Sequence, residues 1–149
     1  MSGITIALPI AQDADAWRRL YNGYADFYQV PMNDQIADAT WGWLLDSSHV
    51  MTGLIAKDGQ GEAIGLAHFR SMPSPLRGAA VGFLDDLFVE PAARGSGAAG
   101  LLMDEIARIG RERGWPMFRW ITADDNYRAR ALYDKVASKT PWNTYQYDL

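Results

Sequence analysis

The 149-residue chain contains no cysteine. This absence excludes a disulfide framework, a thiol nucleophile and a thiolate metal site. Imidazole ligands are equally scarce, because His49 and His68 are the two histidines of the chain. The composition therefore predicts no metal centre.

Long apolar runs and an excess of basic residues are also lacking. No stretch approaches the roughly 20 apolar residues that span a bilayer, and residues 1–10 lack the regions of a secretory signal. The formal charge of −4 and the pI near 5.0 provide no basic stripe for a nucleic-acid backbone. We therefore expect a cytoplasmic protein without a membrane or nucleic-acid partner, and favour a cationic or neutral ligand.

The pattern of apolar residues predicts a single α/β domain over residues 1–149, since no linker or repeat interrupts it. Expected strands cover residues 4–8, 49–56, 63–69, 80–89, 117–122 and 143–147. Expected helices run from 13 or 15 to 27, from 34 to 45, from 97 to 113, and onward from 124 or 125. Gly110 and Gly114 are interpreted as stop signals of the third helix.

A glycine-rich segment, residues 89–100, lies between the strand 80–89 and the helix 97–113. Its sequence is Val-Glu-Pro-Ala-Ala-Arg-Gly-Ser-Gly-Ala-Ala-Gly. Successive backbone N–H groups without bulky side chains, followed by the positive end of a helix dipole, form a cradle for phosphate oxygens. The segment therefore indicates a phosphate-bearing cofactor, unless the glycines serve only a tight turn.

Gly95, Gly97 and Gly100 also satisfy the dinucleotide pattern G-x-G-x-x-G, and Asp124 lies near the distance expected for a ribose-binding acid. In a dinucleotide fold, however, the glycines follow the strand almost at once, whereas residues 90–93 intervene here. The chain after Gly100 is also too short for the rest of a doubly wound sheet. The dinucleotide interpretation is therefore disfavoured.

Three motifs in order resemble the GNAT superfamily of N-acetyltransferases. Arg94-x-x-Gly97-x-Ala99 is similar to its pyrophosphate-binding motif Q/R-x-x-G-x-G/A, and residues 84–89 are similar to its fourth strand. Asn126-x-x-Ala129-x-x-Leu132-Tyr133 is similar to its segment after strand five. The resemblance implies an acyl-CoA N-acyltransferase fold: a mixed, mostly antiparallel twisted sheet of about six to seven strands, flanked by about four helices.

The resemblance also implies acetyl-CoA as co-substrate and assigns a set of residues to it. The backbone N–H of Val89 is the expected oxyanion donor, and Asn126 is assigned to the pantetheine arm or to a helix cap. The glycine-aromatic pair that often follows the tyrosine is absent after Tyr133, and this ending resembles the branch of small polyamine and histone acetyltransferases. The assigned cofactor residues are Leu87, Phe88, Val89, Arg94, Gly95, Ser96, Gly97, Ala98, Ala99, Gly100, Asn126 and Tyr133.

Asp85 and Asp86 are the candidate bases, because an amine must lose a proton before it attacks a thioester. Neighbours on a strand point to opposite faces, so at least one acid should be desolvated unless it lines a cleft. The alternative is a structural pair bonded to a turn or an arginine. The resemblance favours Asp85 as base and Tyr133 as proton donor to the leaving sulfur, where the plainer interpretation of Tyr133 is a core aromatic.

Aromatic residues on the first helix, together with Asp85, are the candidate acceptor-binding residues. Tyr24, Phe27 and Tyr28 follow Tyr21 at helical spacing, which fits cation–π contact with an amine but also an ordinary core stripe. The predicted reaction is direct acetyl transfer, in a ternary complex, to a small cationic amine such as a polyamine, diamine or amino acid. The alternatives are a protein lysine or N-terminal acetyltransferase and a non-catalytic acyl-CoA sensor. The resemblance also implies a homodimer.

Overall fold

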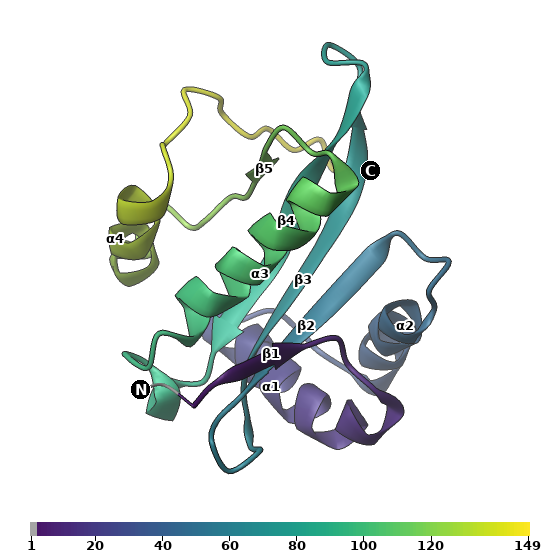
Figure 1. Cartoon of the computed structure of the whole chain (residues 1–149), viewed down its shortest axis with the longest axis vertical. Helices are drawn as coiled ribbons and strands as arrows, with labels where there is room; N and C mark the ends of the chain where they lie inside the picture. The colour runs from purple at the N-terminus through teal and green to yellow at the C-terminus, as the bar shows by residue number, and fades with distance from the viewer. Residues whose placement is uncertain (1–2) are drawn as a thin grey trace.

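The computed structural model describes residues 3–149 and contains five strands and four α-helices (Figure 1). The strands are β1 (Thr5–Ala7), β2 (Met51–Lys57), β3 (Ala63–Ser74), β4 (Ala79–Val89) and β5 (Phe118–Arg119). The α-helices are α1 (Ala14–Phe27), α2 (Asp34–Leu45), α3 (Ala98–Arg113) and α4 (Tyr127–Val136). Short 3₁₀ helices, η1 (Ala11–Asp13) and η2 (Pro91–Ala93), precede α1 and α3. Within residues 3–149 no helix is both long and apolar enough to cross a membrane.

The sheet has the strand order β1-β2-β3-β4-β5, with antiparallel pairing from β1 to β4 and parallel pairing between β4 and β5. The predicted mixed, mostly antiparallel sheet is therefore confirmed. The expected six to seven strands are wrong for the described residues, because 143–147 form no strand. This segment is exposed and pairs with no strand of the sheet.

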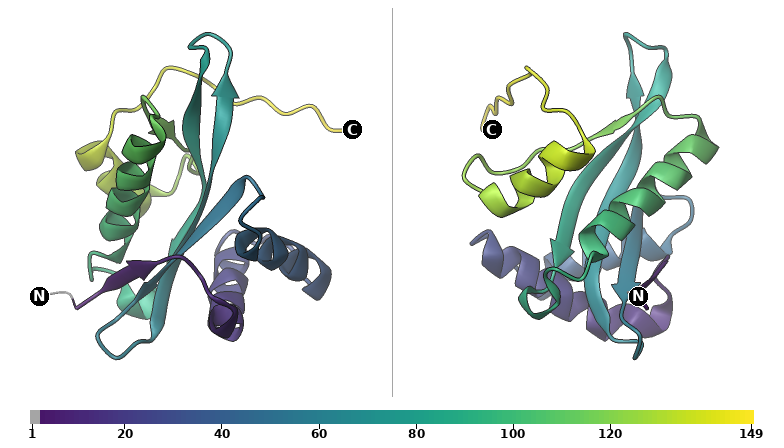
Figure 2. Two further views of the ribbon diagram at one scale, coloured as in Figure 1. Left: turned by 45° about the vertical axis from the view of Figure 1, so that its right-hand side comes forward. Right: turned by 60° about the vertical axis from the view of Figure 1, so that its left-hand side comes forward.

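Helices cover both faces of the sheet (Figure 2). On β2, Leu54 belongs to the core shared with α3, while the next residue, Ile55, belongs to the core shared with α1 and α2. The predicted helix over residues 97–113 is confirmed as α3, and its Leu102 and Ile106 are fully buried against the sheet. Because strand side chains alternate between faces, the functional side chains of β3 and β4 can be assigned to one layer or the other.

Two glycines allow Trp115 to pack between α3 and β4. A Cβ atom on Gly110 would lie 2.5 Å from Cε3 of Trp115, and a Cβ on Gly82 would overlap the same indole ring. Gly110 lies within α3, which continues to Arg113, so its prediction as a stop signal is wrong. The helix ends at Gly114, whose φ of 79° is the left-handed conformation typical of a C-terminal glycine.

Candidate active site

A β-bulge in the middle of β4 places both acids on one face of the sheet. Leu84 and Asp86 lie opposite consecutive residues of β3, which leaves Asp85 without a partner. Leu84 packs in the α3 core, whereas Phe88 packs in the α1 core, so the extra residue reverses the alternation of the strand. The expectation that Asp85 and Asp86 point to opposite faces is therefore wrong, and both line the α1 and α2 side.

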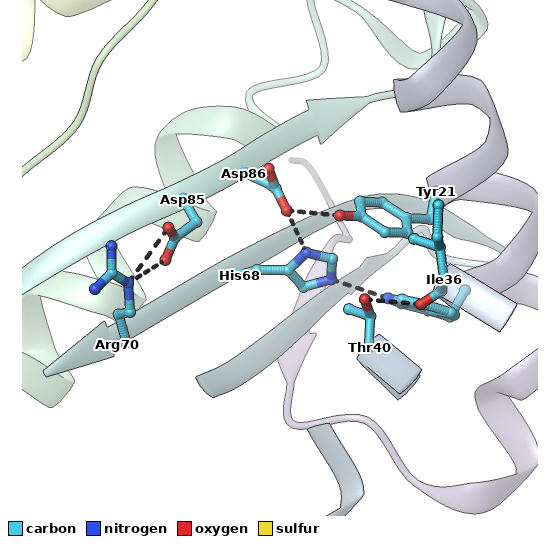
Figure 3. A network of polar contacts seen from close by, with 8 residues as sticks. Tyr21, Ile36, Thr40, His68, Arg70, Asp85 and Asp86 are labelled. Atoms are coloured by element: carbon cyan, nitrogen blue, oxygen red, sulfur yellow. Dashed lines mark hydrogen bonds and ion pairs between the residues drawn. The ribbon is translucent and has the colours of Figure 1, made fainter. Parts of the chain in front are cut away.

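Asp86 is held by a buried hydrogen-bond network (Figure 3). Its Oδ2 lies 2.8 Å from Nδ1 of His68 and accepts a hydrogen bond of 3.1 Å from the hydroxyl of Tyr21. The indole Nε1 of Trp17 donates to Nε2 of His68 at 3.0 Å. Because an indole N–H only donates, Nε2 is the acceptor and the imidazole proton lies on Nδ1, where it donates to Asp86. Burial raises the pKa of Asp86, but hydrogen bonds from His68, Tyr24 and Tyr21 outweigh it and lower the pKa overall.

Asp85 has a different environment. Nε of Arg70 donates to Oδ2 of Asp85 at 3.0 Å and to Oδ1 at 3.3 Å (Figure 3). Burial raises the pKa of Asp85, and the charge of Asp86 adds to this, so that the pKa stays above its ordinary value despite the arginine. Asp85 is therefore the better proton acceptor of the two, and Asp86 is the more rigidly held.

The two acids open into a cavity of about 220 Å³ between the sheet, α1 and α2. Its lining residues are Tyr21, Thr40, Trp43, Met51, His68, Asp85 and Asp86. Sequence reasoning considered His68 only as a metal ligand and did not consider Thr40 or Trp43. A signal for the site was present, because two adjacent acids interrupt an otherwise apolar strand, and a buried acid needs a partner or a cleft.

The glycine-rich loop has the geometry of an anion cradle. Gly95 and Gly97 have φ values of 83° and 89°, a left-handed conformation that glycine adopts without strain. Ser96 Oγ accepts from the N–H of Ala98 at 3.3 Å. In the described part of the chain, the N–H groups of Ala99 and Gly100 in the first turn of α3 have no hydrogen-bond partner. These free donors, at the positive end of a helix dipole, fit the pyrophosphate of a coenzyme A derivative.

Beside the loop, β4 and β5 separate. The N–H of Glu90 bonds to the carbonyl of Ile64 at 2.9 Å, so the antiparallel register turns the N–H groups of Leu87 and Val89 away from β3. On that side, within the described residues, β5 pairs with β4 at Gly82 and Phe83, near the start of β4. The backbone of Val89 is thus open toward the gap, whereas Phe88 turns its ring into the α1 core.

Residues from α1 and α4 meet at this gap. The side chain of Asn126 accepts from the N–H of Ala129 at 3.3 Å, which caps α4, and its Nδ2 donates to the hydroxyl of Tyr28 at 3.3 Å. Tyr133 packs edge-on against Trp120, with ring centroids 5.2 Å apart. Burial, with a smaller contribution from Tyr28, raises the pKa of Tyr133 to about 12, so its hydroxyl stays protonated at neutral pH.

The predicted aromatic residues at the end of α1 lie between the acid cavity and the glycine-rich loop. Tyr24 lies 4.9 Å from Tyr28 and 6.0 Å from Phe88 between ring centroids. Phe27 is half exposed and carries the guanidinium of Arg94 over its ring at 5.2 Å. Phe27, with Tyr28 against it, thus lies beside Arg94 of the glycine-rich loop, whereas Tyr24 lies beside Asp86.

A second cavity, of about 420 Å³, lies between α3, β5 and the end of α4. It is mostly apolar, and its lining includes Gly100 of the glycine-rich loop but neither Asp85 nor Asp86. Within residues 3–149, no cluster of three or more histidine, aspartate or glutamate side chains is arranged to hold a metal ion.

Comparison with known proteins gives consistent results. The model of the Acetyltransferase (GNAT) family matches residues 17–137. A D-amino-acid N-acetyltransferase of Saccharomyces cerevisiae is 32% identical over 130 residues, covering 87% of this chain and 81% of the relative. A thialysine N-epsilon-acetyltransferase of Caenorhabditis elegans is 31% identical over 70 residues, 44% of each chain. The crystal structure of a ribosomal-protein-alanine N-acetyltransferase from Brucella melitensis biovar Abortus 2308 superposes with a TM-score of 0.83 at 27% identity, covering 98% of this chain and 99% of that chain.

The fold is therefore that of the acyl-CoA N-acyltransferases. The chain belongs to the GNAT family and is an N-acetyltransferase that uses acetyl-CoA. This result confirms the resemblance found in the sequence and removes the non-catalytic sensor from consideration.

Proposed function

We propose that this enzyme acetylates the primary amine of a small acceptor bound in the cavity beside Asp85 and Asp86. The observation that carries the proposal is the bulge, which turns both acids into one cavity of about 220 Å³. A cavity of this size suits a small molecule better than a polypeptide segment. The negative charge of its wall suits an ammonium group.

In this proposal Asp85 accepts the amine proton, directly or through a water molecule. A free amine is needed for direct attack, and a carboxyl whose pKa is raised is a more effective base near neutral pH. Asp86 keeps its negative charge, since its pKa is lowered, and attracts the incoming ammonium group. The small cationic acceptors that these charges favour are a polyamine, a diamine or an amino acid.

Acetyl-CoA supplies the activated acetyl thioester. The backbone N–H of Val89 points into the gap between β4 and β5 and is the proposed donor to the developing oxyanion. Tyr133 is the proposed donor to the sulfur. Because its pKa of about 12 lies above the roughly 8.5 of an ordinary thiol, Tyr133 keeps its proton and hydrogen-bonds to the sulfur as the C–S bond breaks, and the thiolate takes up the proton that the attacking amine releases as the amide forms.

The named relatives support a small acceptor. The yeast relative is named for D-amino acids and the nematode relative for thialysine, and both compounds carry an amine. The second candidate function is acetylation of a protein N-terminus or lysine, and the similarity to the Brucella enzyme, which is named for a ribosomal protein, favours it. A protein acceptor would have to insert its amine into the same cavity.

The homodimer and the cytoplasmic location also remain proposals. Residues 138–149 are exposed, and Trp142, Tyr145 and Tyr147 are at least 77% exposed. Aromatic side chains in such a segment favour burial against a second copy. Analytical ultracentrifugation of the full chain and of a chain ending at residue 140 tests this: we expect a dimer for the first and a monomer for the second, and a monomeric full chain would contradict the proposal.

The first experiment measures thiol release from acetyl-CoA with polyamines, diamines, amino acids and basic peptides. We expect turnover with small amines and a loss of roughly 100- to 10,000-fold in kcat/KM for Asp85→Asn. Asp26→Asn, an exposed acid of α1, is the matched control and should keep full activity. Turnover confined to the peptides would favour the protein-acetylating alternative.

A further inference from the structure

The guanidinium of Arg70 is fixed beside the acid cavity, where it bonds to the lining residue Asp85, and part of its hydrogen-bonding capacity is unused. Arg70 lies on β3 two residues after His68, and therefore on the same face of the sheet as Asp85 and Asp86. Its Nε is bonded to Asp85, and its guanidinium carbon lies 5.0 Å from the ring centroid of Phe83. These two contacts hold the guanidinium plane in one orientation.

The two terminal nitrogens of Arg70 have no hydrogen-bond partner within residues 3–149. The side chain is 34% exposed, and it adjoins the cavity through its partner Asp85, which lines it. Met51, which lines the cavity, is the residue opposite Arg70 on β2. A planar guanidinium with a free edge is the preferred partner of a carboxylate, which it binds through two parallel hydrogen bonds.

The charges around the cavity distinguish between the amines considered above. Asp85 and Asp86 are negative and Arg70 is positive, and the proton position on His68 makes that side chain neutral. A diamine or polyamine would bring a second cation close to Arg70. An amino acid instead offers its ammonium group to the acids and its carboxylate to the arginine.

We propose that the acceptor is an amino acid and that Arg70 is its carboxylate anchor. This inference rests on the proposed function, since it assumes acetyl transfer in the cavity beside Asp85. It assigns a specificity role to Arg70, in which the arginine selects acceptors that carry a carboxylate next to the amine.

The test compares each acceptor with its uncharged analogue. The D- and L-forms of leucine, methionine and phenylalanine are assayed beside their carboxamides, which keep the amine and the shape but lack the negative charge. For the wild-type enzyme we expect kcat/KM for the better acids to exceed that of their amides by roughly 10- to 100-fold, the value of charge-assisted hydrogen bonds. In Arg70→Gln this ratio should fall to about 1, and Arg70→Lys should keep part of it.

The ratio of acid to amide, measured within each variant, is the decisive quantity. Removing Arg70 also frees Asp85 and changes turnover of all acceptors, but this effect cancels in the ratio. Arg77→Gln, at the exposed tip of the β3–β4 hairpin, is the control and should keep the wild-type ratio. If Arg70→Gln does not fold, the acid-to-amide ratios of the wild type and of Arg70→Lys still test whether Arg70 binds the carboxylate.

Failure of the inference differs from failure of the proposed function. Amides or diamines turned over as fast as amino acids by the wild-type enzyme, or an unchanged ratio in folded Arg70→Gln, would overturn the role of Arg70 and leave small-amine acetylation in place. Turnover of basic peptides alone would overturn both.

Discussion

Replacing His68 by Phe tests whether the buried network holds Asp86. His68 is 1% exposed and bridges the indole of Trp17 to the carboxylate. Phenylalanine keeps an aromatic ring beside Tyr21 but removes both nitrogens. The change leaves the N–H of Trp17 buried without an acceptor, and Asp86 loses its closest donor. An orphaned neutral donor costs about 1–3 kcal/mol and a lost bond to a charged group about 1.5–3 kcal/mol, so the free energy of unfolding should fall by about 2.5–6 kcal/mol.

Urea unfolding followed by tryptophan fluorescence measures this change, and thermal melting should show a decrease of roughly 10 °C. His49→Phe is the control at the other histidine of the chain. That ring accepts one hydrogen bond, from the N–H of Met51 at 3.0 Å, and its replacement should cost about 1 kcal/mol or less. A loss below about 1 kcal/mol for His68→Phe would refute the network as described.

Two further measurements distinguish the loss of these hydrogen bonds from a change in side-chain packing. Adding Trp17→Phe to His68→Phe removes the orphaned N–H. The double variant should therefore lose less free energy of unfolding than the two single variants lose in sum.

The pH dependence of the free energy of unfolding should also change in His68→Phe. Asp86 has a folded pKa below its ordinary value of 3.8, so it stabilises the fold above that pH, and this contribution is lost as the pH falls through the folded pKa. In His68→Phe the pKa of Asp86 should rise, and the variant and the wild type should therefore differ less in acid than at neutral pH.

Four other changes have defined outcomes. Gly82→Ala forces a Cβ against Trp115 and should destabilise the protein by about 1–3 kcal/mol in thermal melting; an unchanged melting temperature would contradict the packing. Tyr133→Phe should lower kcat roughly 10- to 1,000-fold while acetyl-CoA still produces its thermal shift, and an unchanged kcat would exclude the proposed role. Arg94→Ala should weaken acetyl-CoA binding, measured by calorimetry, with less effect on the KM of the amine. The acid limb of the kcat/KM profile should lie above pH 3.8, because Asp85 must lose its proton and its pKa is raised; Asp85→Asn should remove that limb.

Local sequence was sufficient to predict the conformation of the glycine-rich loop that is proposed to bind the cofactor. The positive φ at Gly95 and Gly97 and the free N–H groups at the start of α3 follow from a glycine loop before an amphipathic helix, which the sequence displays directly. The order of elements was also predictable, since each helix and strand up to α4 carries its own apolar period. These features depend on residues close together in the chain.

The acceptor half required the tertiary structure. Alternation along β4 predicts opposite faces for Asp85 and Asp86, and only the register against β3 reveals the extra residue that puts them together. The partners of the acids, His68 and Arg70, come from another strand, and the donor to His68 comes from α1, 51 residues away. The pattern of the final segment predicts a strand, yet it pairs with no strand within the described residues. Sequence alone indicated the chemistry of the chain, because the residues proposed to bind phosphate lie in one contiguous loop, whereas long-range packing decided what lies beside each acid.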